Sequence, residues 1–461
     1  MRVLPAHGVT HLEQSTCSIE ATYSIETWGC QMNVLDGERM AGRLEAAGAT
    51  RASDPLAADV VIFNTCAVRE KSEHKVYSAL GLLARRKQER PELVIGVTGC
   101  VAQVSGDEIL ERAPWVDFVL GTGQVESIAA TVARVRQERR RLSVLELPQD
   151  SPSYAFREIR RDSSFHAYLT VIEGCDQFCT FCIVPFTRGR ERSRRSGEIL
   201  TEAAELVANG YTEITLLGQT VNAYRDPEDS SGLGSLLRRC AAIPGLRRLR
   251  FITSHPNFLD EGILEAMASG PPVAPFLHMP AQSGSDAVLY RMKRRYDAAG
   301  YLEKLIQARR AVPELAVSSD FIVGFPGETD ADFEATLALL REARFDSIFA
   351  FRYSPRPGTA SARWGREKQV PEALSGERLS RLLALQNEIQ AEHNRGLEGR
   401  AFEVLVEGKD PHGNLRGRTP CNRVVQVEEA AAAPGSYLWA TVTRGLPNSL
   451  TARRTARPSA A

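Results

Sequence analysis

The chain has 461 residues, which is enough for two to four domains. Lysine plus arginine equals aspartate plus glutamate, at 57 each, so the overall charge indicates no nucleic-acid partner. Any RNA binding would have to come from local patches. No run of about 18 apolar residues is present, so we expect no membrane span. The first residues lack a signal-peptide core, and the nine cysteines are dispersed and odd in number. We therefore predict a cytoplasmic protein without a disulfide framework.

Residues 1–20 show no periodicity and are predicted to form a loose extension, with Cys17 incidental. From Tyr23 onward, short apolar segments at 24–28, 59–63 and 93–98 alternate with helical patterns. This alternation predicts a parallel sheet with flanking helices, in a first domain over residues 21–137.

A cysteine follows each of these three predicted strands: Cys30, Cys66 and Cys100. In open α/β sheets the carboxyl ends of the strands line one crevice, where ligands bind. Three cysteines far apart in the sequence are therefore candidates for one shared site. The alternative is three separate buried thiols, because free cysteine is a common core residue.

A basic segment at 133–141 is typical of a solvated helix face, and residues 138–160 are predicted to form a linker. A second domain is expected over 161–391. Within it, six apolar segments alternate with helical patterns, which predicts a partial or full βα barrel. The six segments are 167–172, 213–217, 249–253, 275–278, 316–323 and 347–352.

The first of these strands leads into a C-x-x-x-C-x-x-C run formed by Cys175, Cys179 and Cys182. Such a run can direct three thiolates at one centre. A 4Fe–4S cluster takes four thiolates, so three leave one iron open to a small molecule. A structural zinc site is usually closed by four ligands, and the next cysteine downstream is Cys240. The spacing favours a cluster, with zinc or a chance match as the alternatives.

Polar and glycine-rich segments follow the later strands, where a βα barrel places its chemistry. Gly218 and Gly324 would let a ligand approach the backbone, although glycines also simply end strands. His255 and His278 are interpreted as hydrogen-bonded groups rather than metal ligands.

Arginines are concentrated just after the cysteine loop, at residues 187–195. Arginine suits bidentate phosphate contact, so RNA binding at the mouth of the site is the prediction, with a plain solvated segment as the alternative. The predicted RNA contacts here are Arg188, Arg190, Arg192 and Arg194. From Gly399 the apolar period changes to two, which predicts a small β-barrel over 394–457.

The cysteine loop after a strand resembles that of the radical S-adenosylmethionine (SAM) superfamily. The longer segment 175–194, together with Thr27-Trp-Gly-Cys-Gln-Met-Asn33 and Asn64-Thr-Cys-Ala-Val-Arg69, is similar to the MiaB-type tRNA methylthiotransferases. The similarity covers roughly residues 22–450. Small departures occur at Met279-Pro-Ala281, where Leu-Pro-Val is typical, and at Arg294-Arg295-Tyr296-Asp297, where a Gly-Tyr-Thr ending is typical.

The resemblance implies an α/β fold with an N-terminal parallel α/β domain, a partial (βα)6 radical SAM barrel and a C-terminal TRAM β-barrel. It implies a radical SAM 4Fe–4S cluster on Cys175, Cys179 and Cys182, and an auxiliary 4Fe–4S cluster on Cys30, Cys66 and Cys100. The SAM region it implies contains Gly218, Gln282, Gly324 and Glu328. In the TRAM domain, Arg418 and Arg423 are predicted to contact RNA, with a docking module that does not bind RNA as the alternative.

The implied reaction adds a methylthio group to carbon 2 of N6-isopentenyladenosine at tRNA position 37. Two SAM molecules serve, one as methyl donor and one as the source of a 5′-deoxyadenosyl radical. The expected partners are the tRNA anticodon loop and a low-potential electron donor, and a monomer is expected. The alternatives are action on threonylcarbamoyl-adenosine tRNA, action on a ribosomal protein aspartate (RimO-type), and a non-catalytic iron–sulfur electron carrier that binds RNA.

Overall fold

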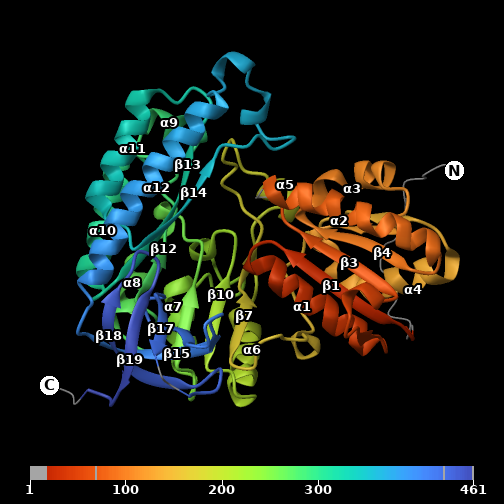
Figure 1. Cartoon of the computed structure of the whole chain (residues 1–461), viewed down its shortest axis with the longest axis horizontal. Helices are drawn as coiled ribbons and strands as arrows, with labels where there is room; N and C mark the ends of the chain where they lie inside the picture. Colours follow the sequence, from red (N-terminus) through yellow and green to blue (C-terminus); the bar gives the residue numbers. More distant parts are fainter. Residues whose placement is uncertain (1–17, 68–69, 429–430, 459–461) are drawn as a thin grey trace.

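The computed structural model describes residues 18–67, 70–428 and 431–458. Cys17, most of the expected extension and the Arg69 end of one quoted motif lie outside these ranges. Figure 1 shows an N-terminal α/β unit beside a larger α/β unit, with a small β-barrel beneath the larger one. None of the helices in the described ranges combines the length and apolar character of a membrane span.

The N-terminal unit contains a six-stranded parallel sheet in the order β2-β1-β3-β4-β5-β6. The predicted strands at 24–28, 59–63 and 93–98 are confirmed as β1, β3 and β4. β3 and β4 are buried along their whole length, because helices cover both faces of the sheet. The strands are β1 (Thr22–Trp28), β2 (Thr50–Arg51), β3 (Val60–Thr65), β4 (Val94–Gly99), β5 (Phe118–Leu120) and β6 (Leu142–Val144). The helices are α1 (Gln31–Ala46), α2 (Glu70–Glu89), α3 (Cys100–Arg112) and α4 (Ile128–Glu138).

β5 and β6 were not predicted, and β6 lies inside the range 138–160 that we expected to be a linker. Each strand has three residues, which is too short to show a period. Their pairing in register, with Phe118 opposite Leu142, extends the sheet by two strands. The basic segment is not wholly a solvated face either, since Arg141 donates to the backbone carbonyl of Val116 at 3.0 Å.

The central unit is a partial barrel of six parallel strands, which confirms the expected fold class. β7, β10 and β11 form one three-stranded sheet, and β12, β13 and β14 form another. A parallel bridge between Leu249 and Val273 connects the two sheets. In the described part of the chain β14 does not pair with β7, so the barrel stays open. The strands are β7 (His166–Thr170), β10 (Glu213–Leu217), β11 (Arg248–Phe251), β12 (Phe276–His278), β13 (Ala316–Val323) and β14 (Ser347–Arg352).

Helices cover the outer face of the barrel and enclose the largest apolar core (Figure 1). They are α6 (Ser196–Ala208), α7 (Leu233–Ala241), α8 (Glu261–Ala268), α9 (Asp286–Met292), α10 (Ala298–Ala311), α11 (Asp330–Ala343) and α12 (Glu372–Arg395). The cysteine loop lies between β7 and α6. Its ends are closed by a short antiparallel pair, β8 (Ile172–Glu173) with β9 (Arg192–Ser193), and it contains α5 (Val184–Arg188).

The C-terminal unit is a closed five-stranded barrel in the order β15-β16-β17-β19-β18, as the period-two pattern predicted. Alternate side chains of each strand fill an apolar interior, and closure leaves no unpaired strand edge. The strands are β15 (Ala401–Lys409), β16 (Leu415–Arg418), β17 (Val424–Glu428), β18 (Tyr437–Gly445) and β19 (Leu450–Thr455).

The small barrel docks on the N-terminal ends of the large-barrel strands. Arg250 of β11 donates to the carbonyls of Pro420 at 2.8 Å and Thr419 at 3.0 Å. Arg248, the first residue of β11, donates to the carbonyl of Arg418 at 3.1 Å. The 418–420 turn therefore faces the protein interior, at the end of the strands opposite the cysteine loop.

The departure from the family pattern at residues 294–297 has a local explanation. Arg295 has φ of +55°, a left-handed conformation that favours glycine. Asp297 occupies the N-cap of α10 and accepts a hydrogen bond from the Gly300 amide at 2.8 Å. A carboxylate therefore does here what a threonine hydroxyl would do in the typical Gly-Tyr-Thr ending.

Replacing Asp297 with alanine should lower the free energy of unfolding by about 1 kcal/mol, because the Gly300 amide loses its hydrogen-bond acceptor at the N-cap of the helix. Asp297→Thr should retain most of the stability. Urea unfolding followed by circular dichroism measures both changes. Glu303→Ala, on the exposed face of the same helix, is the control, and equal midpoints for Asp297→Ala and Glu303→Ala would contradict the capping role.

Candidate active site with two cysteine centres

Cys30, Cys66 and Cys100 converge at one edge of the N-terminal sheet. Each follows one of three neighbouring parallel strands, β1, β3 and β4. The Cys66 thiol makes hydrogen bonds to both Cys30 and Cys100. The alternative of three separate buried thiols is thereby excluded, and we refer to these residues as the first centre.

Hydrogen bonds among the three thiols of the first centre change their pKa values. The hydrogen bond with Cys66 lowers the pKa of Cys30 to about 6 and that of Cys100 to about 7, against the opposing effect of burial. The charge of Arg188 acts in the same direction on both thiols. The same hydrogen bonds raise the pKa of Cys66. Thiols that deprotonate near neutral pH suit metal binding, which requires thiolates.

Two asparagines from the quoted motifs hold the first centre in place. Asn33 accepts hydrogen bonds from the Cys30 amide and thiol, each at 3.3 Å. Asn64 donates to the carbonyl of Asn33 at 2.7 Å, which ties α1 to β3. Gly99 has φ of +88°, and a Cβ there would lie 2.3 Å from the Thr65 carbonyl oxygen. The motif residues beside the cysteines therefore stabilise the local structure that positions the thiols.

Cys175, Cys179 and Cys182 form a second centre at the carboxyl end of the barrel strands. Cys175 and Cys179 are each 8% exposed. The Cys182 amide donates to the Cys179 carbonyl at 3.0 Å. Burial raises the pKa of Cys182 to about 12, with further contributions from Cys179 and Cys175.

Neighbouring side chains orient this loop. Thr220 lies 3.3 Å from the Cys175 sulfur, and Arg294 donates to the Cys179 sulfur at 3.4 Å. Gln219 accepts a hydrogen bond from the Gly174 amide at 2.6 Å. Sequence reasoning missed these three residues as contributors. The sequence did contain a signal for each of them: Gln219 and Thr220 directly follow a predicted strand, and Arg294 lies in the segment that departs from the family pattern.

The donor sets of both centres fit iron–sulfur clusters. Each centre supplies three thiols, one fewer than the irons of a cubane. In the ranges that the structure describes, no group of three or more His, Cys, Asp or Glu side chains is arranged around a single ion. A structural zinc site is closed by four protein ligands, one more than the three thiols of either centre.

The residues predicted for the SAM region differ in what they do. A Cβ on Gly218 would lie 2.4 Å from Ile172 Cγ2, so this glycine permits close packing behind the cysteine loop. Gly324 has φ of +69° and faces Ser375. Gln282 has φ of +72° and is joined to β13 through its backbone.

The Glu328 carboxylate makes internal contacts. The carboxylate accepts hydrogen bonds from the Gly324 amide at 2.9 Å and from Arg378 at 2.7 Å, in a buried pair. It thereby closes the 324–328 loop. One oxygen of the Glu328 carboxylate is thereby occupied by internal partners, and contact of SAM with Glu328 and its loop stays a prediction.

The arginines that follow the cysteine loop are mostly internal, which differs from the prediction of phosphate contacts. Arg194 is 1% exposed and pairs with Glu202 at 2.8 Å. Arg188 is 5% exposed and pairs with Asp36 of α1 at 2.6 Å. Each guanidinium is neutralised by a carboxylate of a facing element, so neither is available to RNA.

The remaining predicted RNA contacts are also paired within the chain. Arg192 is buried against Glu173, and only Arg190, beside Asp176, has a side chain that is largely exposed, at 73%. In the small barrel, Arg418 pairs with Glu407. Arg423 pairs with Asp346 of the large barrel, so it contributes to docking. Among these six arginines, Arg190 is the most accessible to RNA.

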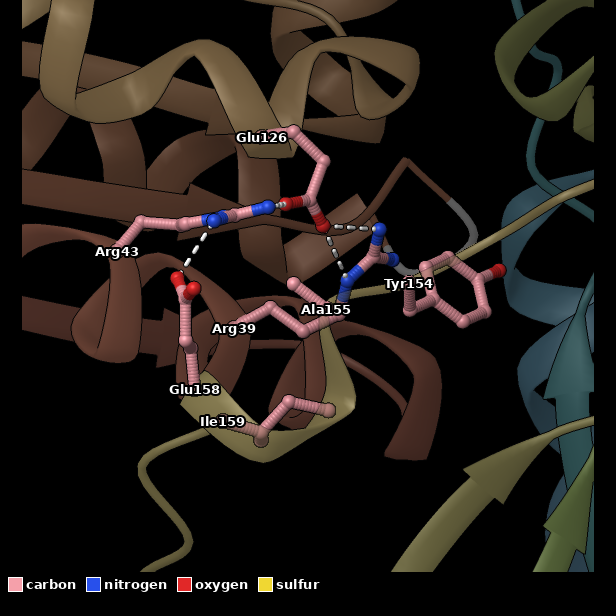
Figure 2. A pocket seen from close by; sticks show the side chains of 7 residues that line it. All are labelled: Arg39, Arg43, Glu126, Tyr154, Ala155, Glu158 and Ile159. Carbon is pink, nitrogen blue, oxygen red and sulfur yellow. Dashed lines mark hydrogen bonds and ion pairs between the residues drawn. The ribbon is translucent and has the colours of Figure 1, made fainter. Parts of the chain in front are cut away.

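A buried ionic network links the two centres, and sequence reasoning missed it. Arg39 of α1 pairs with Glu126 at 2.8 Å and lies 3.7 Å from Glu173, two residues before Cys175. The Tyr154 ring lies 3.9 Å from the Arg39 guanidinium. Figure 2 shows Arg39 and Arg43 meeting at Glu126. Since α1 begins directly after Cys30, this network sets the position of one centre relative to the other.

The two histidines considered as ligands are hydrogen-bonded groups. His255 accepts from the Asn257 amide at 3.2 Å, and burial lowers its pKa to about 3. His278 Nδ1 lies 2.8 Å from the Ser318 hydroxyl. Both histidines therefore have the role expected from the sequence.

Comparisons with known protein families divide the chain in the same way. Residues 22–121 match the "Uncharacterized protein family UPF0004", residues 169–340 the "Radical SAM superfamily" and residues 395–454 the "TRAM domain". Among solved structures, the radical SAM methyltransferase TsrM from Kitasatospora setae is similar in fold, with a TM-score of 0.53 at 14% identity over 74% of each chain.

Curated relatives match this chain over most of its length. The tRNA-2-methylthio-N(6)-dimethylallyladenosine synthase of Acidothermus cellulolyticus is 46% identical over 94% of this chain and 87% of its own. The proteins of the same name from Streptomyces viridosporus and Mycolicibacterium smegmatis are 47% and 45% identical, each over 94% of this chain and 87% and 86% of their own. The chain therefore belongs to the MiaB-type family of tRNA-2-methylthio-N(6)-dimethylallyladenosine synthases, whose members are radical SAM enzymes.

Proposed function

We propose that this chain adds a methylthio group to carbon 2 of N6-isopentenyladenosine at tRNA position 37. The observation that carries the proposal is the gathering of six cysteines into two three-thiol centres. Helix α1 connects them, because it starts beside Cys30 and contacts the start of the cysteine loop through Arg39 and helix α5 of that loop through Asp36.

The placement of the centres supports a division of roles between them. Cys175, Cys179 and Cys182 would hold the cluster that binds SAM, because their loop lies at the carboxyl end of the barrel. Cys30, Cys66 and Cys100 would hold the auxiliary cluster. When bound, the two clusters supply the electron that cleaves SAM to a 5′-deoxyadenosyl radical and the site from which sulfur is delivered.

The chain itself orients and shields these groups. The hydrogen bond between Thr220 and Cys175 and the one that Arg294 donates to the Cys179 sulfur stabilise the conformation of the loop. The burial of Cys175 and Cys179 excludes bulk water. Two SAM molecules are consumed in the proposed reaction, one as methyl donor and one as radical source.

The proposal includes the partners and the setting of the reaction. The target base must leave the stack of the anticodon loop to reach the site, as is usual when proteins recognise single-stranded RNA bases. A low-potential reductant provides the electron, and a monomer is sufficient because both centres lie on one chain. The reducing cytoplasm keeps the six thiols available.

The test uses the anaerobically reconstituted protein with SAM and a low-potential reductant. Three substrates are compared by mass spectrometry: an anticodon stem-loop with isopentenyladenosine, one with threonylcarbamoyladenosine, and the aspartate-containing ribosomal protein substrate of RimO-type enzymes. We expect methylthio product from the first substrate. Product from either of the others would assign the chain to that branch, and an electron carrier would not cleave SAM.

A further inference from the structure

Two phenylalanines of β14 are exposed on the inner face of the open barrel. Phe349 is 52% exposed and Phe351 is 40% exposed. Their neighbours Ile348 and Ala350 pack against the core beneath the outer helices. Since side chains alternate along a strand, Phe349 and Phe351 point to the opposite, inner face. Large aromatic side chains left exposed in this way often mark a binding surface.

A polar pair adjoins these rings on the same face. Asp320 of β13 lies directly opposite Phe349 in the strand register. His278 Nε2 lies 3.5 Å from an oxygen of Asp320, and the His278 and Phe349 rings are 6.1 Å apart in an edge-to-face arrangement. The inner face therefore combines an apolar surface with hydrogen-bonding groups at its side.

This face lies next to the second centre. His278 is the last residue of β12, and the Pro280 carbonyl two residues later accepts a hydrogen bond from Arg294 at 3.2 Å. The same guanidinium donates to the Cys179 sulfur. A group resting on Phe349 and Phe351 would therefore lie inside the barrel, near the loop that would hold the SAM-binding cluster. Apart from the hydrogen bond between His278 and Ser318, none of the roles assigned above uses these four side chains.

We propose that this inner face selects the modified base. Phe349 and Phe351 contact the adenine ring and its apolar dimethylallyl group, and His278 with Asp320 hydrogen-bonds the edge of the base. Aromatic rings bind bases by stacking, and burial of the branched alkyl group adds affinity that an unmodified adenosine lacks. A threonylcarbamoyl group would bring a carboxylate toward Asp320, which disfavours it. The inference rests on the proposed function and identifies what distinguishes its substrate.

The experiment measures binding of fluorescent anticodon stem-loops to the cluster-reconstituted protein with SAM and without reductant. The loops carry adenosine, dimethylallyladenosine or threonylcarbamoyladenosine at the target position. The native protein should prefer dimethylallyladenosine over adenosine by about tenfold or more, which corresponds to burial of roughly two methylene groups. Phe349→Ala and Phe351→Ala should each reduce this preference to about threefold or less. Asp320→Asn should improve binding of the threonylcarbamoyl loop relative to the dimethylallyl loop.

Tyr290→Ala is the matched control, because Tyr290 is an 87% exposed aromatic residue on α9. It should keep the native preference. Phe349→Leu, which preserves an apolar surface, should keep more of the preference than Phe349→Ala. An unchanged preference in both alanine variants, or an equal loss in Tyr290→Ala, would overturn the inference. Failure of the proposed function has a different signature, which appears in the turnover assay with reductant: the native protein cleaves SAM and leaves the dimethylallyl loop unmodified.

Discussion

Cys179→Ala should abolish reductive SAM cleavage, whereas Cys66→Ala should keep SAM cleavage and stop methylthio transfer. The difference follows from the separation of the two centres. Cys179 belongs to the loop at the carboxyl end of the barrel. Cys66 is the middle member of the first centre, hydrogen-bonded to both Cys30 and Cys100. Formation of 5′-deoxyadenosine and of methylthio nucleoside, measured together by liquid chromatography and mass spectrometry, separates the two effects.

Iron and sulfide content gives a second readout that does not depend on turnover. Removing one ligand from either centre should lower iron per chain by up to about half, because a cubane held by two thiolates is lost more readily than one held by three. Cys240→Ala is the control, since Cys240 is buried in the barrel core on α7. If Cys66→Ala still yields methylthio product, the assignment of the first centre is wrong.

Glu202→Ala should cause a large loss of stability. Glu202 of α6 lies between Arg194 at 2.8 Å and Arg161 at 2.9 Å, and all three side chains are at most 4% exposed. Without the carboxylate, the buried Arg194 guanidinium loses its counter-charge, and Arg161 keeps only the more distant Glu38, at 3.8 Å. Removing one partner of a buried ion pair costs about 3–5 kcal/mol in the free energy of unfolding.

The same helix provides a matched control for this prediction. Glu205 also pairs with an arginine, Arg157, but at the protein surface. Exposed pairs are screened by solvent and salt, so Glu205→Ala should leave the unfolding midpoint almost unchanged. Thermal and urea unfolding of both variants would test the difference. Similar midpoints for Glu202→Ala and Glu205→Ala would show that the buried pair contributes little.

The arginine-rich segment illustrates the limit of local sequence reasoning. Five arginines within residues 187–195 indicated phosphate binding, yet Arg188 pairs with Asp36, which is 152 positions away in the chain. The sequence does not indicate which carboxylate such an arginine will pair with, because the pair forms only when folding brings two distant elements together. Figure 1 shows the arrangement responsible, with α5 of the cysteine loop directed at the N-terminal unit.

The sequence by itself determined the order of the large-barrel strands, the closed β-barrel and the two sets of three cysteines. Strand periodicity and ligand spacing are local properties, so a cysteine placed just after a strand could be recognised without coordinates. Only the tertiary structure decided that strands as short as β5 and β6 extend the first sheet, and that Glu328, Arg194 and Arg423 bind other parts of the protein. It also decided that Phe349 and Phe351 face the barrel interior, because contacts between distant segments, and the exposure they leave, arise only when the chain packs.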